Sequence, residues 1–141
     1  MRFLCFAVLC LMVFIGCENS SNHYQFDDQE KLGKELAQQQ LDAYNNRDID
    51  AFMKCYCDSV KVYGFPNDLI MNGWLEMKNR YEQMFLETPD LHCLLLNRMV
   101  QGNTVIDQEL VTRKKGEPAT NAIAIYKVSD NCIQEVYFIR K

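Results

Sequence analysis

The sequence predicts an α+β fold in which N-terminal helices pack on one face of a curved antiparallel sheet. Over most of residues 27–87, apolar side chains recur every three or four positions, which is the period of an amphipathic helix. From residue 91 onward the period changes to two, as in half-buried strands. Short turn sequences separate these later segments, and short turns join antiparallel neighbours. Helices followed by such a meander favour an α+β architecture.

Two helices are expected first. One begins at Asp27, where acidic residues complement the helix dipole, and ends at residues 45–47. Its inward face is apolar apart from one amide, Gln40; the face consists of Leu32, Leu36, Gln40, Ala43 and Tyr44. Asp48 is the expected N-cap of a second, short helix that runs to Tyr56.

The middle of the chain predicts a strand at Ser59–Tyr63, a loop from Gly64 to Gly73 and a third helix from Trp74 to Glu87. Pro89 closes that helix, because the residue before a proline is disfavoured in helical conformation. Four strands complete the domain: Leu91–Gln101, Thr104–Arg113, Thr120–Val128 and Cys132–Arg140.

Two acids on the second of these strands have two interpretations. Asp107 and Glu109 share a face with Val105 and Val111, because side chains alternate along a strand. If that face points inward, Glu109 is a desolvated carboxylate with a raised pKa, able to act as a general base. If it points outward, both acids are ordinary solubilising residues.

The N-terminal segment predicts export. Arg2 precedes an uncharged apolar run, Phe3–Ile15, which Gly16 and Cys17 follow. The run is shorter than the roughly 20 residues that span a bilayer. The segment resembles a bacterial lipoprotein signal, whose cysteine receives lipid after cleavage. We therefore expect a signal peptide at 1–16, a lipidated Cys17 and flexible tether at 17–27, and one domain at 28–141. The expected location is the bacterial cell envelope, lipid-anchored to a membrane; plain secretion is the alternative.

Composition limits which partners, metals and cofactors the chain is expected to bind. The formal net charge is −4, which gives no electrostatic footprint for nucleic acid. The one basic cluster, at 113–115, is expected at a solvated hairpin tip. Four cysteines remain beyond Cys17, namely Cys55, Cys57, Cys93 and Cys132. We expect small buried residues, or one disulfide such as Cys93 with Cys55 or Cys57. The spacing of His and Cys suits no zinc site, and no motif implies a cofactor.

Three strings, Leu41–Pro66, Gly102–Thr112 and Asn121–Arg140, resemble the nuclear-transport-factor-2-like superfamily, in particular its SnoaL-like branch. The similarity spans roughly residues 28–140. It implies a cone, in which a bent antiparallel sheet wraps a long helix and encloses a pocket. It also implies a homodimer formed through the outer face of the sheet, where Ile123 and Ile125 are expected. The superfamily hosts several activities, so the resemblance does not fix a function.

Positions that carry known chemistry in this superfamily hold other residues here. The resemblance aligns Gln40, Gly64 and Ala124 with the tyrosine, base and acid of ketosteroid isomerases. Phe138 falls where epoxide hydrolases place a water-activating carboxylate. Neither mechanism is therefore expected.

The expected pocket residues are mainly aromatic: Gln40, Tyr63, Trp74, Tyr81, Tyr126, Phe138 and Arg140. Arg140 is expected at the mouth, paired with Glu109 or holding an anionic ligand, unless it is a surface residue. Three hypotheses follow. The domain binds a small apolar molecule, or it is a lyase, isomerase or hydrolase with Glu109 as general base, or it is a homodimeric interaction module.

Overall fold

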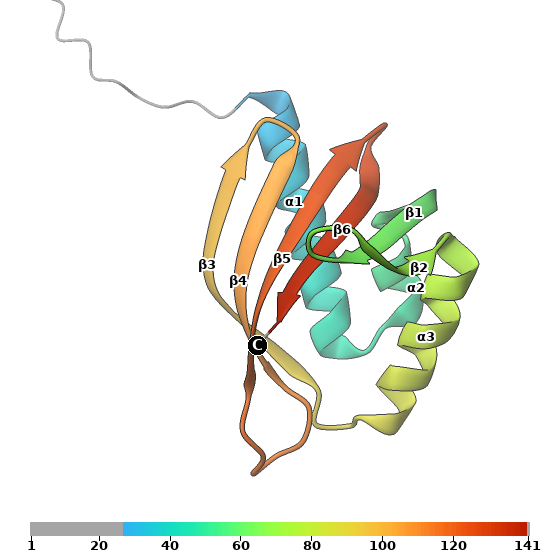
Figure 1. The fold of residues 1–141 in the computed structure, drawn as a ribbon, viewed down its shortest axis with the longest axis vertical. Helices are drawn as coiled ribbons and strands as arrows, with labels where there is room; N and C mark the ends of the chain where they lie inside the picture. Colours follow the sequence, from blue (N-terminus) through green and yellow to red (C-terminus); the bar gives the residue numbers. More distant parts are fainter. Residues whose placement is uncertain (1–26, 141) are drawn as a thin grey trace, which may run out of the picture.

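The computed structural model describes residues 27–140, which fold into helices packed on one six-stranded sheet (Figure 1). In chain order the elements are α1 (Asp28–Asn46), α2 (Ile49–Met53), β1 (Tyr56–Gly64), β2 (Asp68–Asn72), α3 (Trp74–Glu87), β3 (His92–Gln101), β4 (Thr104–Thr112), β5 (Thr120–Ser129) and β6 (Cys132–Arg140). The α+β class is confirmed. Cys17 and the predicted signal and tether up to residue 26 lie outside the described residues.

The strand order is β2-β1-β6-β5-β4-β3. Strands β3 to β6 form the expected antiparallel meander. In contrast to the fully antiparallel sheet that we predicted, β1 pairs parallel with β6. A parallel pair needs a long crossover, and here the chain between β1 and β6 contains α3 and the rest of the meander. The first strand therefore joins the sheet beside the last.

Local sequence explains where the first helices begin. The Asp27 carboxylate accepts a hydrogen bond from the Glu30 amide at 2.8 Å, and Glu30 reaches back to the Asp27 amide, forming a capping box. Asp48 caps α2 with its carboxylate, which accepts a hydrogen bond from the Ala51 amide at 2.9 Å. These caps confirm both predicted helix starts.

Two predictions for the middle of the chain are wrong. The second helix ends at Met53, not at Tyr56, which instead begins β1. The reason is tertiary, because the Cys55 carbonyl accepts a hydrogen bond from the Ile133 amide of β6 at 2.8 Å. The predicted loop also contains an edge strand, β2, which pairs with β1. A five-residue strand defined by its partner leaves little periodicity in the sequence.

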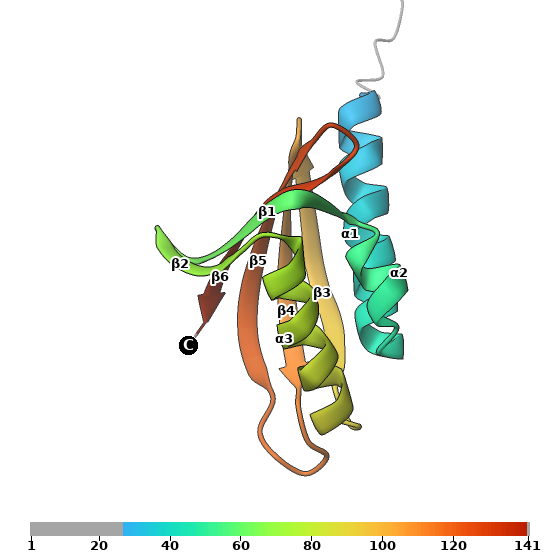
Figure 2. The same ribbon diagram turned by 90° about the vertical axis from the view of Figure 1, so that its right-hand side faces the viewer.

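The core lies between the helices and the inner face of the sheet. Helix α1 packs on β3 to β6, and α3 packs on β1 and β2 (Figure 2). Aromatic side chains from α1, α2 and α3 meet there, with the rings of Phe52 and Tyr81 only 4.6 Å apart between centroids. No helix within residues 27–140 has the length and apolar character needed to cross a bilayer.

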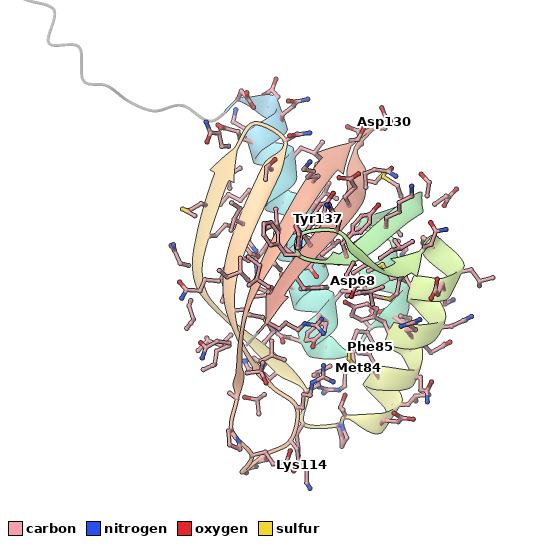
Figure 3. The ribbon with its side chains drawn as sticks, in the orientation of Figure 1. Asp68, Met84, Phe85, Lys114, Asp130 and Tyr137 are labelled. Atoms are coloured by element: carbon pink, nitrogen blue, oxygen red, sulfur yellow. A yellow bond between two sulfur atoms is a disulfide. The ribbon has the colours of Figure 1, made fainter. Side chains whose placement is uncertain are left out.

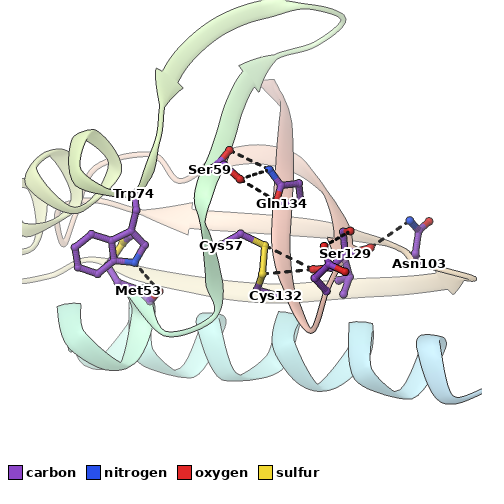
Figure 4. Close-up of a disulfide and its surroundings, with 10 residues drawn as sticks. Met53, Cys57, Ser59, Trp74, Asn103, Ser129, Cys132 and Gln134 are labelled. Atoms are coloured by element: carbon purple, nitrogen blue, oxygen red, sulfur yellow. Dashed lines mark hydrogen bonds between the residues drawn. A yellow bond between two sulfur atoms is a disulfide. The ribbon is translucent and has the colours of Figure 1, made fainter.

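A disulfide joins Cys57 of β1 to Cys132 of β6, with Cα atoms 5.2 Å apart (Figure 4). The sequence suggested Cys93 as a partner, and this is wrong: Cys93 and Cys55 are free and buried. The two bonded cysteines are 75 residues apart in the chain, and only the parallel pairing of β1 and β6 makes them neighbours.

Candidate functional site

The inner face of β4 carries Asp107 and Glu109, the two acids whose orientation the sequence did not decide. Asp107 is fully buried and Glu109 is 5% exposed, so this face points into the core and not toward solvent. The two carboxyl groups nevertheless have different surroundings.

Asp107 is closed off by an arginine. Arg98, its cross-strand partner on β3, donates from Nε to Oδ1 and from Nη2 to Oδ2, both at 2.7 Å. Such a bidentate pair is strong and geometrically fixed. Arg98 also donates to Gln38 on α1 at 3.0 Å, which ties the pair to the helix. Asp107 is therefore part of the structural core.

Glu109 borders a cavity of about 80 Å³. Its walls come from α1, α2, α3 and strands β1 and β3 to β6, and they are largely aromatic and aliphatic. The residues that line it are Gln40, Leu41, Tyr44, Phe52, Tyr56, Tyr81, Met84, Cys93, Glu109, Val111, Arg113, Thr120, Ala122, Tyr126, Phe138 and Arg140. Ala122, opposite Glu109 on β5, is small and leaves room beside the carboxyl group.

The surroundings of Glu109 raise its pKa to about 7. Burial is the main cause, and the nearby negative charge of Asp107 adds to it. Hydrogen bonds from Tyr126 and Cys93 and the charge of Arg98 act in the opposite direction. The Tyr126 hydroxyl donates to Glu109 Oε1 at 3.2 Å. A carboxyl group with this pKa exchanges protons readily near neutral pH.

Tyr126 is itself held by a chain of buried hydrogen bonds. Gln40 donates from Nε2 to the Tyr126 hydroxyl at 3.0 Å, and its Oε1 accepts from the Tyr56 hydroxyl at 3.2 Å. Gln40 Nε2 also donates to the Ala37 carbonyl at 3.2 Å. The Tyr126 hydroxyl accepts from Gln40, so its own proton is directed at Glu109. Gln40, the polar exception on the predicted helix face, thus orients the base through Tyr126.

A second cavity of about 170 Å³ adjoins the first. The two share five residues, namely Tyr81, Met84, Arg113, Phe138 and Arg140. Both arginines are exposed, so they mark the rim. Met84 on α3 lines both cavities, whereas Lys114 lies out at the tip of the β4–β5 hairpin (Figure 3).

The structure brings together most of the predicted site. Gln40, Tyr81, Glu109, Tyr126, Phe138 and Arg140 line one cavity. Tyr63 and Trp74 line neither of the two cavities described here, contrary to expectation. Tyr63 stacks on Tyr137, and the Trp74 indole N–H donates to the Met53 carbonyl at 3.2 Å (Figure 4).

Arg140 forms no ion pair with Glu109; its guanidinium lies 4.5 Å from the centre of the Phe138 ring.

The lining residues that the sequence analysis missed include Tyr44, Tyr56, Cys93 and Arg113. Arg113 was assigned to a solvated hairpin tip. The signal was present, because Arg113 continues the alternation that runs through Asp107, Glu109 and Val111. Within residues 27–140, His, Cys, Asp and Glu form no cluster of three or more that could hold a metal ion.

Comparison with known proteins gives a family but no assigned activity. The SnoaL-like domain matches residues 37–136. A search of curated proteins finds no significant match. Many solved structures share the fold.

Three of these structures illustrate the similarity. A cystatin-fold protein from Novosphingobium aromaticivorans has 24% identity and a TM-score of 0.70, covering 77% of this chain and 97% of its own. A protein from Jannaschia sp. CCS1 that is named as a SnoaL-like polyketide cyclase has 15% identity and a TM-score of 0.69, covering 83% of this chain and 90% of its own. A protein from Streptomyces galilaeus that is named as a hydroxylase has 17% identity and a TM-score of 0.67, covering 79% of this chain and 80% of its own. At these identities the likeness establishes the fold alone.

Proposed function

The chain belongs to the SnoaL-like domain family, and we propose that its cavity binds a small, largely apolar molecule from which Glu109 removes a proton. One observation carries the proposal: a buried carboxyl group with a pKa of about 7 stands in the wall of an aromatic cavity. This combination is typical of a general base that works near neutral pH. Two of the similar structures are named as a polyketide cyclase and a hydroxylase, and these names support an enzyme that acts on a small organic molecule.

The proposed reaction is proton abstraction next to a carbonyl group. Ionised Glu109 takes the proton of the C–H bond, and the bonding electrons move toward the carbonyl oxygen of the substrate. The Tyr126 hydroxyl, bound to Glu109 Oε1, holds the carboxylate in place as it accepts the proton. The neutral acid then returns the proton to another carbon of the substrate, so the domain acts as an isomerase; return of a proton to the same carbon gives exchange.

This base differs from those of the better-known relatives. Gln40, Gly64, Ala124 and Phe138 occupy the aligned positions, and none of these side chains is a carboxyl group or a phenol. A ketosteroid-isomerase or epoxide-hydrolase mechanism therefore lacks its groups here. Glu109 is the ionisable acid that lines the described cavity.

Deuterium exchange tests the proposal without knowledge of the natural substrate. Small ketones such as phenylacetone are incubated with the protein in D₂O, and loss of the α-proton signal is followed by NMR. We expect exchange to rise with pH through about 7 and then level off, and E109Q to abolish it. E82Q, at an exposed site on α3, is the matched control. If E109Q exchanges as fast as wild type, or no ketone is exchanged, the cavity is not this catalyst.

We further propose that the domain is exported and anchored by lipid on Cys17, with secretion as the alternative. The Cys57–Cys132 disulfide supports export, because disulfides persist in oxidising compartments. Intact-mass measurement of the membrane fraction tests the anchor. The expected result is cleavage before Cys17 plus the mass of several acyl chains, and release of C17S from the membrane. Release of the unmodified wild-type protein would favour secretion.

The homodimer is also proposed. Its support is an apolar row across the outer face of the sheet, in which neighbouring strands align Met99, Ile106, Ile125, Tyr137 and Tyr63. Such a row on a free surface is costly unless a partner covers it. Sedimentation of the mature domain tests this proposal. We expect a dimer that I125K converts to a monomer, and a wild-type monomer would contradict it.

A further inference from the structure

Arg113 and Arg140 stand out among the charged residues of the domain. Both line both cavities, and both are exposed. Within residues 27–140 neither forms an ion pair, although six other pairs are present. Arg140 instead lies over the Phe138 ring, and Arg113 Nη1 is 3.9 Å from the Met84 sulfur. Within the described residues their donors thus have no carboxylate to bind.

The two cations act on one place. Tyr81 lines both cavities with them, and both guanidinium charges oppose the burial that raises the pKa of Tyr81 to about 12. Arg140 is opposite Ala122, and Ala122 is opposite Glu109. Two strand spacings of about 4.8 Å therefore put the Arg140 backbone roughly 10 Å from that of Glu109. A small molecule can span this distance, with one end at the rim and the other inside.

We infer that the ligand of this cavity is a carboxylate with a small apolar body, its carboxylate group bound by Arg113 and Arg140 and its body directed toward Glu109. Guanidinium groups match carboxylates geometrically, which an ammonium does not. The opposite orientation would place the carboxylate beside Glu109 and Asp107, where like charges repel. The direction of the body rests on the proposed function; the anion site does not.

Calorimetry with phenylacetate and its neutral isostere phenylacetamide tests the inference. We expect the wild type to prefer phenylacetate, and we expect R113Q and R140Q each to weaken phenylacetate binding about 5- to 10-fold without changing phenylacetamide binding. Added salt should weaken only the phenylacetate complex. Both arginines are exposed, so the variants should unfold at the wild-type temperature.

The control is K115Q, which removes the same charge from an exposed neighbour that lines neither cavity. It should bind phenylacetate like wild type. Equal affinity for the two probes, no binding of either, or equal loss in K115Q and R113Q would overturn the inference. E109Q separates the two proposals, because it should abolish deuterium exchange and keep the preference for phenylacetate.

Discussion

Asp107 and Glu109 are two residues apart on the same face of one strand, and the fold gives them opposite roles. Asp107 is fully buried against Arg98, with both carboxylate oxygens bound. Glu109 faces a cavity, and a tyrosine hydroxyl holds its Oε1. The first is a fixed part of the core, and the second is able to exchange a proton with a ligand. Two carboxyl groups on one strand thus have different roles, because the residues around them differ.

The cross-strand partners account for the difference. On β3, Arg98 is opposite Asp107, whereas Leu95 is opposite Glu109. A cation favours the ionised form of its neighbour, while an apolar neighbour and burial favour the neutral form. On β5 the partners are Ala124 and Ala122, of which only Ala122 borders the cavity. The core is therefore closed around one acid and hollow beside the other.

Removing the cation of the closed pair should have the largest effect. R98M leaves the Asp107 charge buried without a partner, which costs about 3–5 kcal/mol of unfolding free energy. Urea denaturation at pH 7 measures it. The double variant R98M/D107L should recover most of the loss, because apolar side chains replace a buried pair at little cost. A loss below about 1 kcal/mol in R98M would show that the pair is not closed.

Removing the charge of Glu109 should instead increase the unfolding free energy at high pH. The folded-state pKa of about 7 lies above the ordinary 4.5, so the stability from this group is full below pH 4.5 and is lost as the pH rises through 7. E109Q escapes this loss. Its unfolding free energy should exceed that of wild type by about 3 kcal/mol at pH 8 and match it below pH 4.5. Parallel curves for E109Q and E82Q would contradict a buried Glu109.

Filling the two alanine positions compares packing directly. A124V adds carbons opposite Asp107, where the core is full, and should cost about 1–3 kcal/mol. A122V adds the same carbons beside the cavity and should cost less than about 1 kcal/mol. A122V should also weaken phenylacetate binding. A124V should weaken it less, because Ala124 does not line the cavity. Equal destabilisation by the two variants would argue against a hollow next to Glu109.

Loss of one hydroxyl should have the smallest effect. Y126F removes the donor that stabilises ionised Glu109, so the pKa of Glu109 should rise further above 7. Carbon-13 NMR of the Glu109 carboxyl group measures the shift. Y137F is the control, because it deletes a hydroxyl bonded to Glu135 elsewhere on the sheet. An unchanged titration in Y126F would remove Tyr126 from the site.

Sequence patterns predicted the elements whose signals are local. Asp27 and Asp48 cap helices through neighbours three residues away, and alternation in the meander placed β3 to β6. The same alternation put Asp107 and Glu109 on one face with Val105 and Val111. Arg113 lies exposed in the β4–β5 connection, as expected, but it also lines the cavity, which was not expected. The edge strand β2 and the start of β1 were missed, because pairing with distant strands defines them.

The amino-acid sequence alone establishes the α+β class, the family resemblance, the predicted export signal and the presence of two acids on one strand face. Tertiary packing establishes that this face is internal, that Arg98 pairs with one acid and that the other borders a cavity with Arg113 and Arg140 at its rim. The physical reason is that pKa and charge pairing depend on burial and on neighbours within a few ångströms. Chain order places β3 to β6 side by side, but it does not set the register that pairs Arg98 with Asp107, nor the packing of α1 on the inner face of these strands.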